Sequence, residues 1–186
     1  MHLMIDMIDI DYNNGFLRPM TEADLSSILV MRNHIEIRRY MFRQHEISLE
    51  EHISWFERVS QDPSIELSVL EINGKCCGFL QFKETNFPGV VDWGFYIDPE
   101  APKGTGNKLG VWALSQSFKK DCLHKICGQV LSWNLNSIKL HKSLGFMQEG
   151  ILREHYFDGK LYHDLICLSI IRKNWITNEE SKGNLR

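Results

Sequence analysis

The stretch from Trp93 to Phe146 constrains this chain most, because a short glycine loop lies there between a strand pattern and a helix pattern. The loop reads Lys103-Gly104-Thr105-Gly106-Asn107-Lys108. Its glycines allow main-chain N–H groups to point into one concavity, and the positive end of the following helix adds an attraction for a diphosphate. A glycine pair before a helix is more often only a turn, so this loop alone identifies no site.

A second motif downstream gives the loop a meaning. It reads Asn134-x-x-Ser137-x-x-x-His141-x-x-x-Gly145-Phe146 and places an amide, a hydroxyl and an imidazole on one short helix. The loop is not a Walker phosphate-binding loop, because no Gly-Lys-Ser/Thr follows it. It is not the dinucleotide-binding fingerprint either, because Leu109 stands where that motif has its third glycine. The two motifs together predict an enzyme that binds a phosphate-bearing cofactor and delivers a proton nearby.

Size and composition limit the class of protein. A chain of 186 residues with 43% hydrophobic residues predicts one domain with a real core. A net charge of −3 gives no general attraction to nucleic acid, and no apolar run reaches the length of a membrane span. Five cysteines without a C-x-x-C pair indicate neither disulfides nor a metal site. We therefore expect a cytoplasmic enzyme with no metal, no nucleic-acid partner and no membrane association.

The order of patterns predicts an α/β (α+β) domain over residues 15–175, with one mixed sheet and helices on its faces. Residues 1–14 read as an N-terminal extension without signal-peptide features, and 176–186 read as a polar tail. Two capping boxes, at Thr21 and Ser48, predict helix starts, and Asn73-Gly74 predicts a hairpin turn. Strands are expected at 16–19, 65–72, 75–84, 90–97, 125–131, 146–157 and 160–171, and helices at 21–32, from 48, at 108–121 and at 137–144.

Strand, glycine loop, helix, strand and the Asn-Ser-His motif resemble the Gcn5-related N-acetyltransferase superfamily over about 16–171. The resemblance implies a central mixed sheet of about seven strands, splayed between the fourth and fifth, with about four helices. It also implies that acetyl-coenzyme A is the co-substrate and lies in the gap. The residues it assigns to the co-substrate are Phe95, Tyr96, Ile97, Lys103, Gly104, Thr105, Gly106, Asn107, Lys108, Asn134 and Ser137.

Two positions depart from the family pattern. Ala101, followed by Pro102, stands where the loop usually begins with Arg or Gln, and Lys103 is a replacement for that charge. His141 stands where a Tyr usually faces the sulfur, so the resemblance implies that His141 is the catalytic general acid to the leaving thiolate. The alternative is that His141 is a structural residue of its helix.

The acceptor is predicted from the first half of the chain. Arg32-Asn33-His34, the run from Ile37 to Phe42 and the run from Ile47 to Phe56 resemble the bacterial nucleotide-sugar acetyltransferases of pseudaminic acid biosynthesis. That family acetylates the 4-amino group of UDP-4-amino-4,6-dideoxy-N-acetyl-β-L-altrosamine. Arginines suit a diphosphate, and aromatic and thioether side chains suit a uracil or a methyl group. The predicted substrate-binding residues are Arg32, Arg38, Arg39, Tyr40, Met41 and Arg43.

Other interpretations stay open. The run from Glu149 to Arg153 resembles ribosomal-protein N-acetyltransferases, which favours a peptide N-terminus as acceptor. A non-catalytic acyl-coenzyme A binding module and a merely solvated basic loop are further alternatives. The family resemblance implies direct transfer without a covalent intermediate, and the residues leave the general base open among His45, Glu84, Asp92 and His155. The oligomeric state is also open, with a homodimer as one option.

Overall fold

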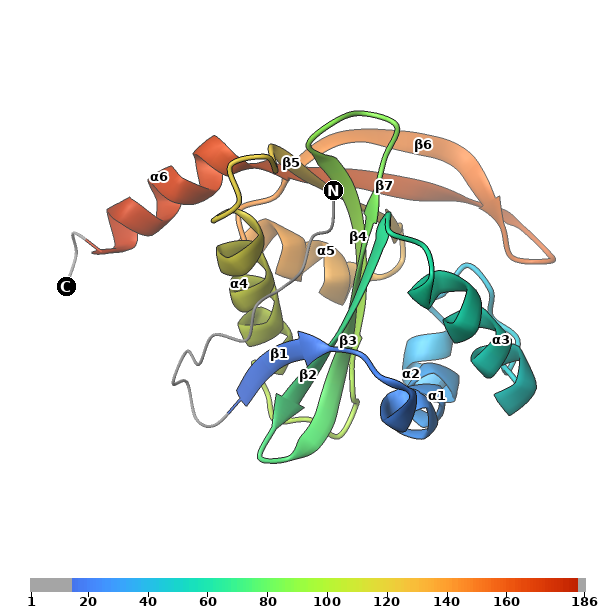
Figure 1. The fold of residues 1–186 in the computed structure, drawn as a ribbon. Coiled ribbons are helices and arrows are strands. Elements are labelled where there is room, and N and C mark those ends of the chain that lie inside the picture. The colour runs from blue at the N-terminus through green and yellow to red at the C-terminus, as the bar shows by residue number, and fades with distance from the viewer. Residues whose placement is uncertain (1–14, 184–186) are drawn as a thin grey trace. The chain divides into compact units, whose positions relative to one another are not determined.

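The computed structural model describes residues 15–183, and the predicted N-terminal extension lies outside them (Figure 1). Seven strands form one sheet in the order β1-β2-β3-β4-β5-β7-β6. The pairs β1–β2, β2–β3, β5–β7 and β6–β7 are antiparallel, and the parallel pairing of β4 with β5 makes the sheet mixed, as predicted. The strands are β1 (Gly15–Pro19), β2 (Ile65–Ile72), β3 (Lys75–Glu84), β4 (Val90–Ile97), β5 (Lys125–Leu131), β6 (Met147–Phe157) and β7 (Tyr162–Ile171).

The described part of the chain has more helices than the four predicted. They are α1 (Leu25–Asn33), α2 (Ile35–Arg38), α3 (Leu49–Ser60), α4 (Thr105–Ser117), α5 (Leu135–Ser143) and α6 (Arg172–Gly183), with the 3₁₀ turn η1 (Glu22–Asp24) before α1. The additional helices are α2, which His34 caps by accepting the Glu36 N–H, and α6, which extends into the region predicted as a tail. No helix among residues 15–183 is both long and apolar enough to cross a membrane.

The chain divides into two compact units. The first runs to Lys83 and includes Gly94–Ala113, and the second comprises Glu84–Trp93 and the residues from Leu114 onward. The first four residues of β4 therefore belong to the second unit and its last four to the first. Each unit has its own core and holds its own set of the predicted site residues.

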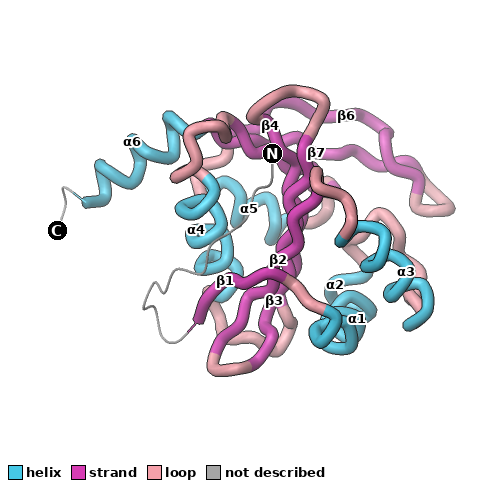
Figure 2. Tube along the Cα trace, viewed as in Figure 1, coloured by secondary structure: helices cyan, strands magenta, loops and turns pink. Residues whose placement is uncertain are grey.

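The first unit packs α1, α2 and α3 together beside its strands (Figure 2). The helix α3 begins where the sequence predicts, since the Ser48 hydroxyl accepts the N–H of Glu51 at 3.2 Å. Its apolar face contributes Phe56 to a core that includes Ile28 from α1 and Val69 from β2, and Ile28 and Val69 are fully buried. This packing fixes the helices that carry the predicted acceptor residues.

The hairpin between β2 and β3 confirms the turn predicted from Asn73-Gly74. Both residues adopt positive φ, 52° and 75°, as the tight turn that matches strand twist requires. The partner strands then pair in the antiparallel register that joins Ile72 to Lys75. Turn chemistry therefore determined this local structure, as the sequence indicated.

The second unit is built on β5, β7 and β6, with α5 between β5 and β6 in the chain. The strand β5 pairs with β7 along its whole length, from Lys125 opposite Ile171 to Leu131 opposite Leu165. Buried side chains such as Ile126, Leu168 and Ile170 form its core. Each unit thus has its own apolar core, and a few polar side chains are buried beside it.

Candidate functional site

The glycine loop of the first unit turns directly into a helix. α4 begins at Thr105, three residues earlier than predicted, because the Thr105 hydroxyl donates to the Pro102 carbonyl at 2.7 Å and turns inward, where it is 2% exposed. Gly104 has a φ of 90°, which other residues rarely adopt, and its carbonyl accepts the N–H of Lys108. The N–H of Thr105 donates to the Pro102 carbonyl at 3.2 Å, and the start of α4 is the positive end of the helix dipole, which favours an anion.

The end of β4 in the first unit packs closely on β3. A side chain at Gly78 would meet Ile97 Cδ1 at 2.9 Å and the Tyr96 carbonyl at 3.2 Å, so a glycine is needed at this contact. The Tyr96 ring stacks on Phe79 with centroids 5.0 Å apart. These contacts fix the strand Phe95–Ile97, which is predicted to bind the co-substrate through its main chain.

The helix α5 of the second unit carries the other predicted cofactor residues. Asn134 is its N-cap, and the Asn134 side-chain oxygen accepts the N–H of Ser137 at 3.1 Å. Asn134 therefore orients the start of the helix, which is a structural role in addition to the predicted contact with the co-substrate. Ser137 presents its carbonyl to His141 one turn later.

His141 is buried, with 3% of its surface exposed, and both of its ring nitrogens are hydrogen-bonded. Its Nδ1 lies 2.8 Å from the Ser137 carbonyl, and its Nε2 accepts the indole N–H of Trp93 at 3.0 Å. Burial lowers the pKa of His141, so the ring is neutral. In this arrangement neither nitrogen has a proton directed toward a leaving group. The role of general acid stays a prediction, and these hydrogen bonds support a positioning role instead.

The predicted acceptor residues lie in the first unit, and Arg32 differs from the others. Its side chain is 9% exposed, its Nη2 donates to the Arg43 carbonyl, and its Nη1 has no hydrogen-bond partner among the described residues. Burial lowers its pKa, which shows how unfavourable the environment is for an uncompensated charge. A guanidinium remains charged even so, because its intrinsic pKa is very high.

The remaining arginines of this segment are paired or open to solvent. Arg38 lies 3.3 Å from Glu46, and Arg39 lies 2.7 Å from Glu36 while its guanidinium stacks over the Tyr40 ring at 4.8 Å. Arg43 is exposed, and Met41 packs against the core of the first unit. The structure therefore brings the predicted basic and aromatic residues into one region, but only Arg32 is both buried and partly unpaired.

His52 is a polar residue of this region that the sequence did not single out. It is 4% exposed and stacks on Trp55 with ring centroids 5.2 Å apart. Its Nε2 has no hydrogen-bond partner among the described residues. Burial lowers its pKa, and the nearby charge of Arg32 lowers it further. His52 lies in the run from Ile47 to Phe56 that resembles the nucleotide-sugar acetyltransferases. Only its burial in the structure distinguishes it from the other polar residues of that run.

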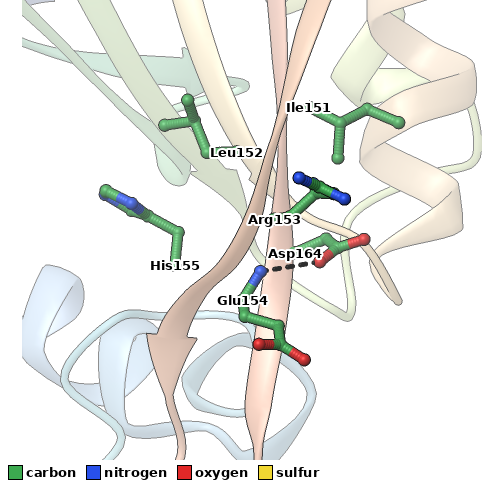
Figure 3. Close-up of a pocket in the computed structure, with 6 residues that line it drawn as sticks. All are labelled: Ile151, Leu152, Arg153, Glu154, His155 and Asp164. Atoms are coloured by element: carbon green, nitrogen blue, oxygen red, sulfur yellow. Dashed lines mark hydrogen bonds between the residues drawn. The ribbon is translucent and has the colours of Figure 1, made fainter.

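A bulge in β6 forms an open hollow in the second unit. It is lined by Ile151, Leu152, Arg153, Glu154, His155 and Asp164 (Figure 3). Glu154 has a φ of 48°, and its N–H donates to the Asp164 carboxylate at 2.8 Å. Leu152 and His155 project to the same side of the strand (Figure 3). His155 is one of the residues considered as a general base, and it lies in this bulged part of β6.

The structure thus groups the predicted residues in two sets. The first unit holds the acceptor residues, the glycine loop and Phe95–Ile97, and the second holds Asn134, Ser137 and His141. Among residues 15–183 no group of three His, Cys, Asp or Glu side chains could hold a metal ion.

Comparison with known proteins identifies the family. The model of the acetyltransferase (GNAT) domain matches residues 17–167, most of the chain. The chain belongs to the GNAT acetyltransferase family. GNAT abbreviates the Gcn5-related N-acetyltransferase name, so the resemblance inferred from the two motifs is confirmed, and so is the predicted mixed sheet.

Relatives of this GNAT protein include several bacterial N-acetyltransferases. Spermidine N(1)-acetyltransferase of Escherichia coli K12 is 24% identical over 90% of this chain and 91% of its own length. The uncharacterized N-acetyltransferase YokL of Bacillus subtilis is 34% identical over 67% of this chain and 71% of its own. A crystal structure of spermidine N-acetyltransferase from Vibrio cholerae, in complex with CoA and spermine, superposes with a TM-score of 0.80 at 27% identity, covering 88% of this chain and 98% of that one.

The GNAT protein is therefore an N-acetyltransferase that uses acetyl-CoA as its co-substrate. Its own residues fit that ligand in kind, since the start of α4 offers N–H groups to a diphosphate and Lys103 and Lys108 flank it. The comparisons therefore establish the acetyl-transfer activity and the co-substrate.

Proposed function

We propose that this GNAT protein transfers acetyl from acetyl-CoA to the 4-amino group of a UDP-linked 4-amino-4,6-dideoxy sugar of pseudaminic acid biosynthesis. The observation that carries the proposal is Arg32, a buried guanidinium with an N–H that has no partner among the described residues. Burying such a charge is unfavourable unless something supplies acceptors. The oxygens of a nucleotide diphosphate are suitable acceptors, and arginine is the side chain best shaped to bind them.

The neighbouring carboxylates support an anionic acceptor. Glu36 pairs with Arg39, Glu46 pairs with Arg38, and Glu51 lies 3.1 Å from His45. Glu36 and Glu46 already have arginine partners within the segment, so they offer little to the ammonium groups of a polyamine. Arg32 is the buried cation of this segment whose Nη1 has no partner among the described residues, and it favours a negatively charged ligand.

Aromatic side chains near this cation fit the rest of such a ligand. His52 stacks on Trp55, and Trp55 in turn meets Phe79 edge to face at 6.1 Å. The unpartnered Nε2 of His52 adds a hydrogen-bonding atom of the kind that a uracil or a sugar hydroxyl uses. Met41 contributes a soft apolar surface suited to a 6-deoxy methyl group.

A polyamine is a second candidate acceptor, because several relatives that match over most of their length are named spermidine N(1)-acetyltransferases. A peptide N-terminus is a third, on the resemblance of the run from Glu149 to Arg153 to ribosomal-protein N-acetyltransferases. No contact within the described residues favours the peptide over the sugar.

We infer direct transfer, in which the neutral amine attacks the thioester carbonyl, a C–N bond forms, the C–S bond breaks and the thiolate leaves. Burial raises the pKa of Cys76, Cys77 and Cys127, so these thiols are poor nucleophiles at neutral pH. A sugar amine is less basic than a lysine, so a modest base or a water chain is enough to deprotonate it.

Steady-state kinetics with a panel of acceptors test the proposal. The panel contains a UDP-4-amino-4,6-dideoxy sugar, spermidine, and a peptide with a free N-terminus, each at saturating acetyl-CoA. We expect kcat/KM to be highest for the nucleotide sugar. Turnover of spermidine but not of the sugar would replace this proposal by the polyamine function.

Thermal unfolding with UDP gives an independent measurement. A ligand that binds only the folded state stabilises it by about 2.7 kcal/mol at a concentration of 100 times its Kd. We expect UDP to raise the Tm and spermidine at equal concentration to leave it unchanged. A shift with spermidine alone would contradict the assignment of Arg32 to an anion.

A further inference from the structure

Three buried rings of the second unit form what we call the ring cluster: Trp93, His141 and Phe146. Each is less than 10% exposed. Trp93 stacks on Phe146 with centroids 4.9 Å apart and planes 14° apart, and His141 meets both rings edge to face. The members come from β4, from α5 and from the residue before β6, so the cluster joins three elements of this unit.

The ring cluster lies directly on Gly128 of β5. A Cβ atom at this position would be 2.8 Å from His141 Nε2 and 2.9 Å from Trp93 Nε1, closer than real contacts allow. Those two nitrogens are the donor and acceptor of the indole–imidazole hydrogen bond. Glycine is therefore required here for space, because the hydrogen bond occupies the volume of a side chain.

The position along the sheet is specific. The parallel pairing of β4 with β5 covers Val90–Asp92 opposite Lys125–Cys127. Trp93 and Gly128 are the next residue on each strand. The ring cluster thus stands at the place where this short parallel ladder ends, within the part of the chain that the structure describes.

The hydrogen bonds define which atoms are needed. A carbonyl can only accept, so the His141 Nδ1 that contacts the Ser137 carbonyl carries the proton, and Nε2 accepts from Trp93. Position 93 must therefore supply a donor, and position 141 must supply an acceptor at that point. Removal of either partner would break this buried hydrogen bond, and so would protonation of His141 Nε2.

We propose that Trp93 and His141 are positioning residues for the acetyl transfer, whose hydrogen bond on Gly128 fixes the residue at which β4 and β5 stop pairing. Where two strands stop pairing, the main chain that follows can bond to the amides of an extended ligand instead. The arm of acetyl-CoA carries such amides. A displaced end of the ladder would therefore weaken the binding of acetyl-CoA more than it slows the chemical step.

Trp93→Phe is the first test, because it keeps the ring stack and removes only the donor. We expect the KM for acetyl-CoA to rise about tenfold, while kcat changes by less than about threefold and the acceptor KM is unchanged. His141→Leu, which removes the acceptor, should give the same effect, and the double variant should be no worse than either single one. Additive effects would overturn the proposal.

His141→Gln separates positioning from acid catalysis, because its amide oxygen can accept the indole N–H but cannot act as an acid. We expect this variant to retain the KM for acetyl-CoA within about threefold and to retain the pH profile of kcat, since a positioning role needs only the acceptor. A loss of kcat by about 100-fold or more at unchanged KM would establish His141 as the general acid and overturn the proposal.

Gly128→Ala tests whether the hydrogen bond between Trp93 and His141 needs the space that Gly128 leaves free. We expect it to raise the KM for acetyl-CoA as Trp93→Phe does. Gly150→Ala is the matched control, since Gly150 lies in the same unit and nothing lies within 4 Å of the place its Cβ would take. Thermal unfolding establishes that each variant is folded. A folded Gly128→Ala enzyme with an unchanged KM would contradict the proposal, and if it does not fold, Trp93→Phe decides.

Discussion

The two units bury nitrogen-bearing side chains in opposite ways. In the second unit both ring nitrogens of His141 are hydrogen-bonded, to Trp93 and to Ser137. In the first unit the Nη1 of Arg32 and the Nε2 of His52 are buried and have no partner among the described residues. Buried polar atoms in native proteins are nearly always satisfied, so an exception needs an explanation.

This difference distinguishes buried polar groups that stabilise the fold from buried polar groups that are candidates for binding a ligand. A satisfied group such as His141 is complete without a ligand, so its hydrogen bonds stabilise the fold. An unsatisfied group such as Arg32 weakens the protein without a ligand, and we propose that a ligand supplies its missing partner. We therefore propose a positioning role for His141 in the second unit and a binding role for Arg32 in the first, and the following substitutions test this contrast.

The largest effect is expected from Arg32→Met. Losing the buried cation should lower kcat/KM for the UDP-amino-sugar about 100-fold, since removing one partner of a buried charged contact costs roughly 2–5 kcal/mol. The free energy of unfolding without ligand should change by less than about 1 kcal/mol, because removing the buried charge and its unpaired N–H offsets the lost hydrogen bond to the Arg43 carbonyl. Acceptor kinetics and urea denaturation measure the two quantities.

Arg58→Met is the matched control for this substitution. Arg58 lies near the end of α3 in the same unit, and its side chain is exposed. It should change neither quantity. An Arg32→Met enzyme with full activity would show that the unpaired N–H has no ligand, and equal losses in both variants would show that only general charge matters.

A smaller effect in the opposite direction is expected from His141→Leu. This substitution removes the acceptor to which the buried Trp93 N–H donates, so the free energy of unfolding should fall by about 1–3 kcal/mol. Urea denaturation gives the value. The contrast between the units would be wrong if His141→Leu were as stable as the wild type while Arg32→Met unfolded more readily.

The smallest effect is a dependence of stability on pH. Burial lowers the pKa of His52 and His141 below the ordinary value of 6.5, so the folded state holds both rings neutral. Their contribution is fully present above about pH 6.5 and is lost as the pH falls, because the unfolded chain binds protons first. Each ring contributes a slope of at most about 1.4 kcal/mol per pH unit.

Denaturant midpoints between pH 7.5 and 5 measure this slope, and His141→Gln isolates one ring. We expect the variant to lose stability less steeply on acidification than the wild type does. Bound UDP should reduce the part of this pH slope that His52 contributes, because we propose that the Nε2 of His52 contacts the ligand. A wild-type stability that rises on acidification would contradict a neutral buried His141.

Local patterns predicted much of the fold. The Ser48 cap, the Asn73-Gly74 turn and all seven strands appear where the sequence placed them, since each depends on residues close together in the chain. The start of α4 was placed three residues too late, because the inward hydrogen bond of Thr105 is not visible in a glycine pattern. The helix α2 was missed because its four residues give no periodic signal.

The candidate site was predictable in kind but not in detail. The glycine loop and the Asn134-Ser137-His141 motif identified the family, while the basic segment that contains Arg32 stays a predicted acceptor site. The sequence could not rank Arg32 above Arg38 and Arg39, since all are arginines within one short segment. It also could not separate His52 from any other polar residue on a helix.

What the sequence determined by itself is the set of local devices: caps, turns, strand patterns and the loop that make this a GNAT acetyltransferase. What only the tertiary structure decided is which polar atoms find partners. Trp93 and His141 are 48 residues apart, and they meet because β5 has no side chain at Gly128. Burial and hydrogen-bond satisfaction depend on such distant contacts, so the roles proposed for His141, Arg32 and His52 rest on packing rather than on pattern.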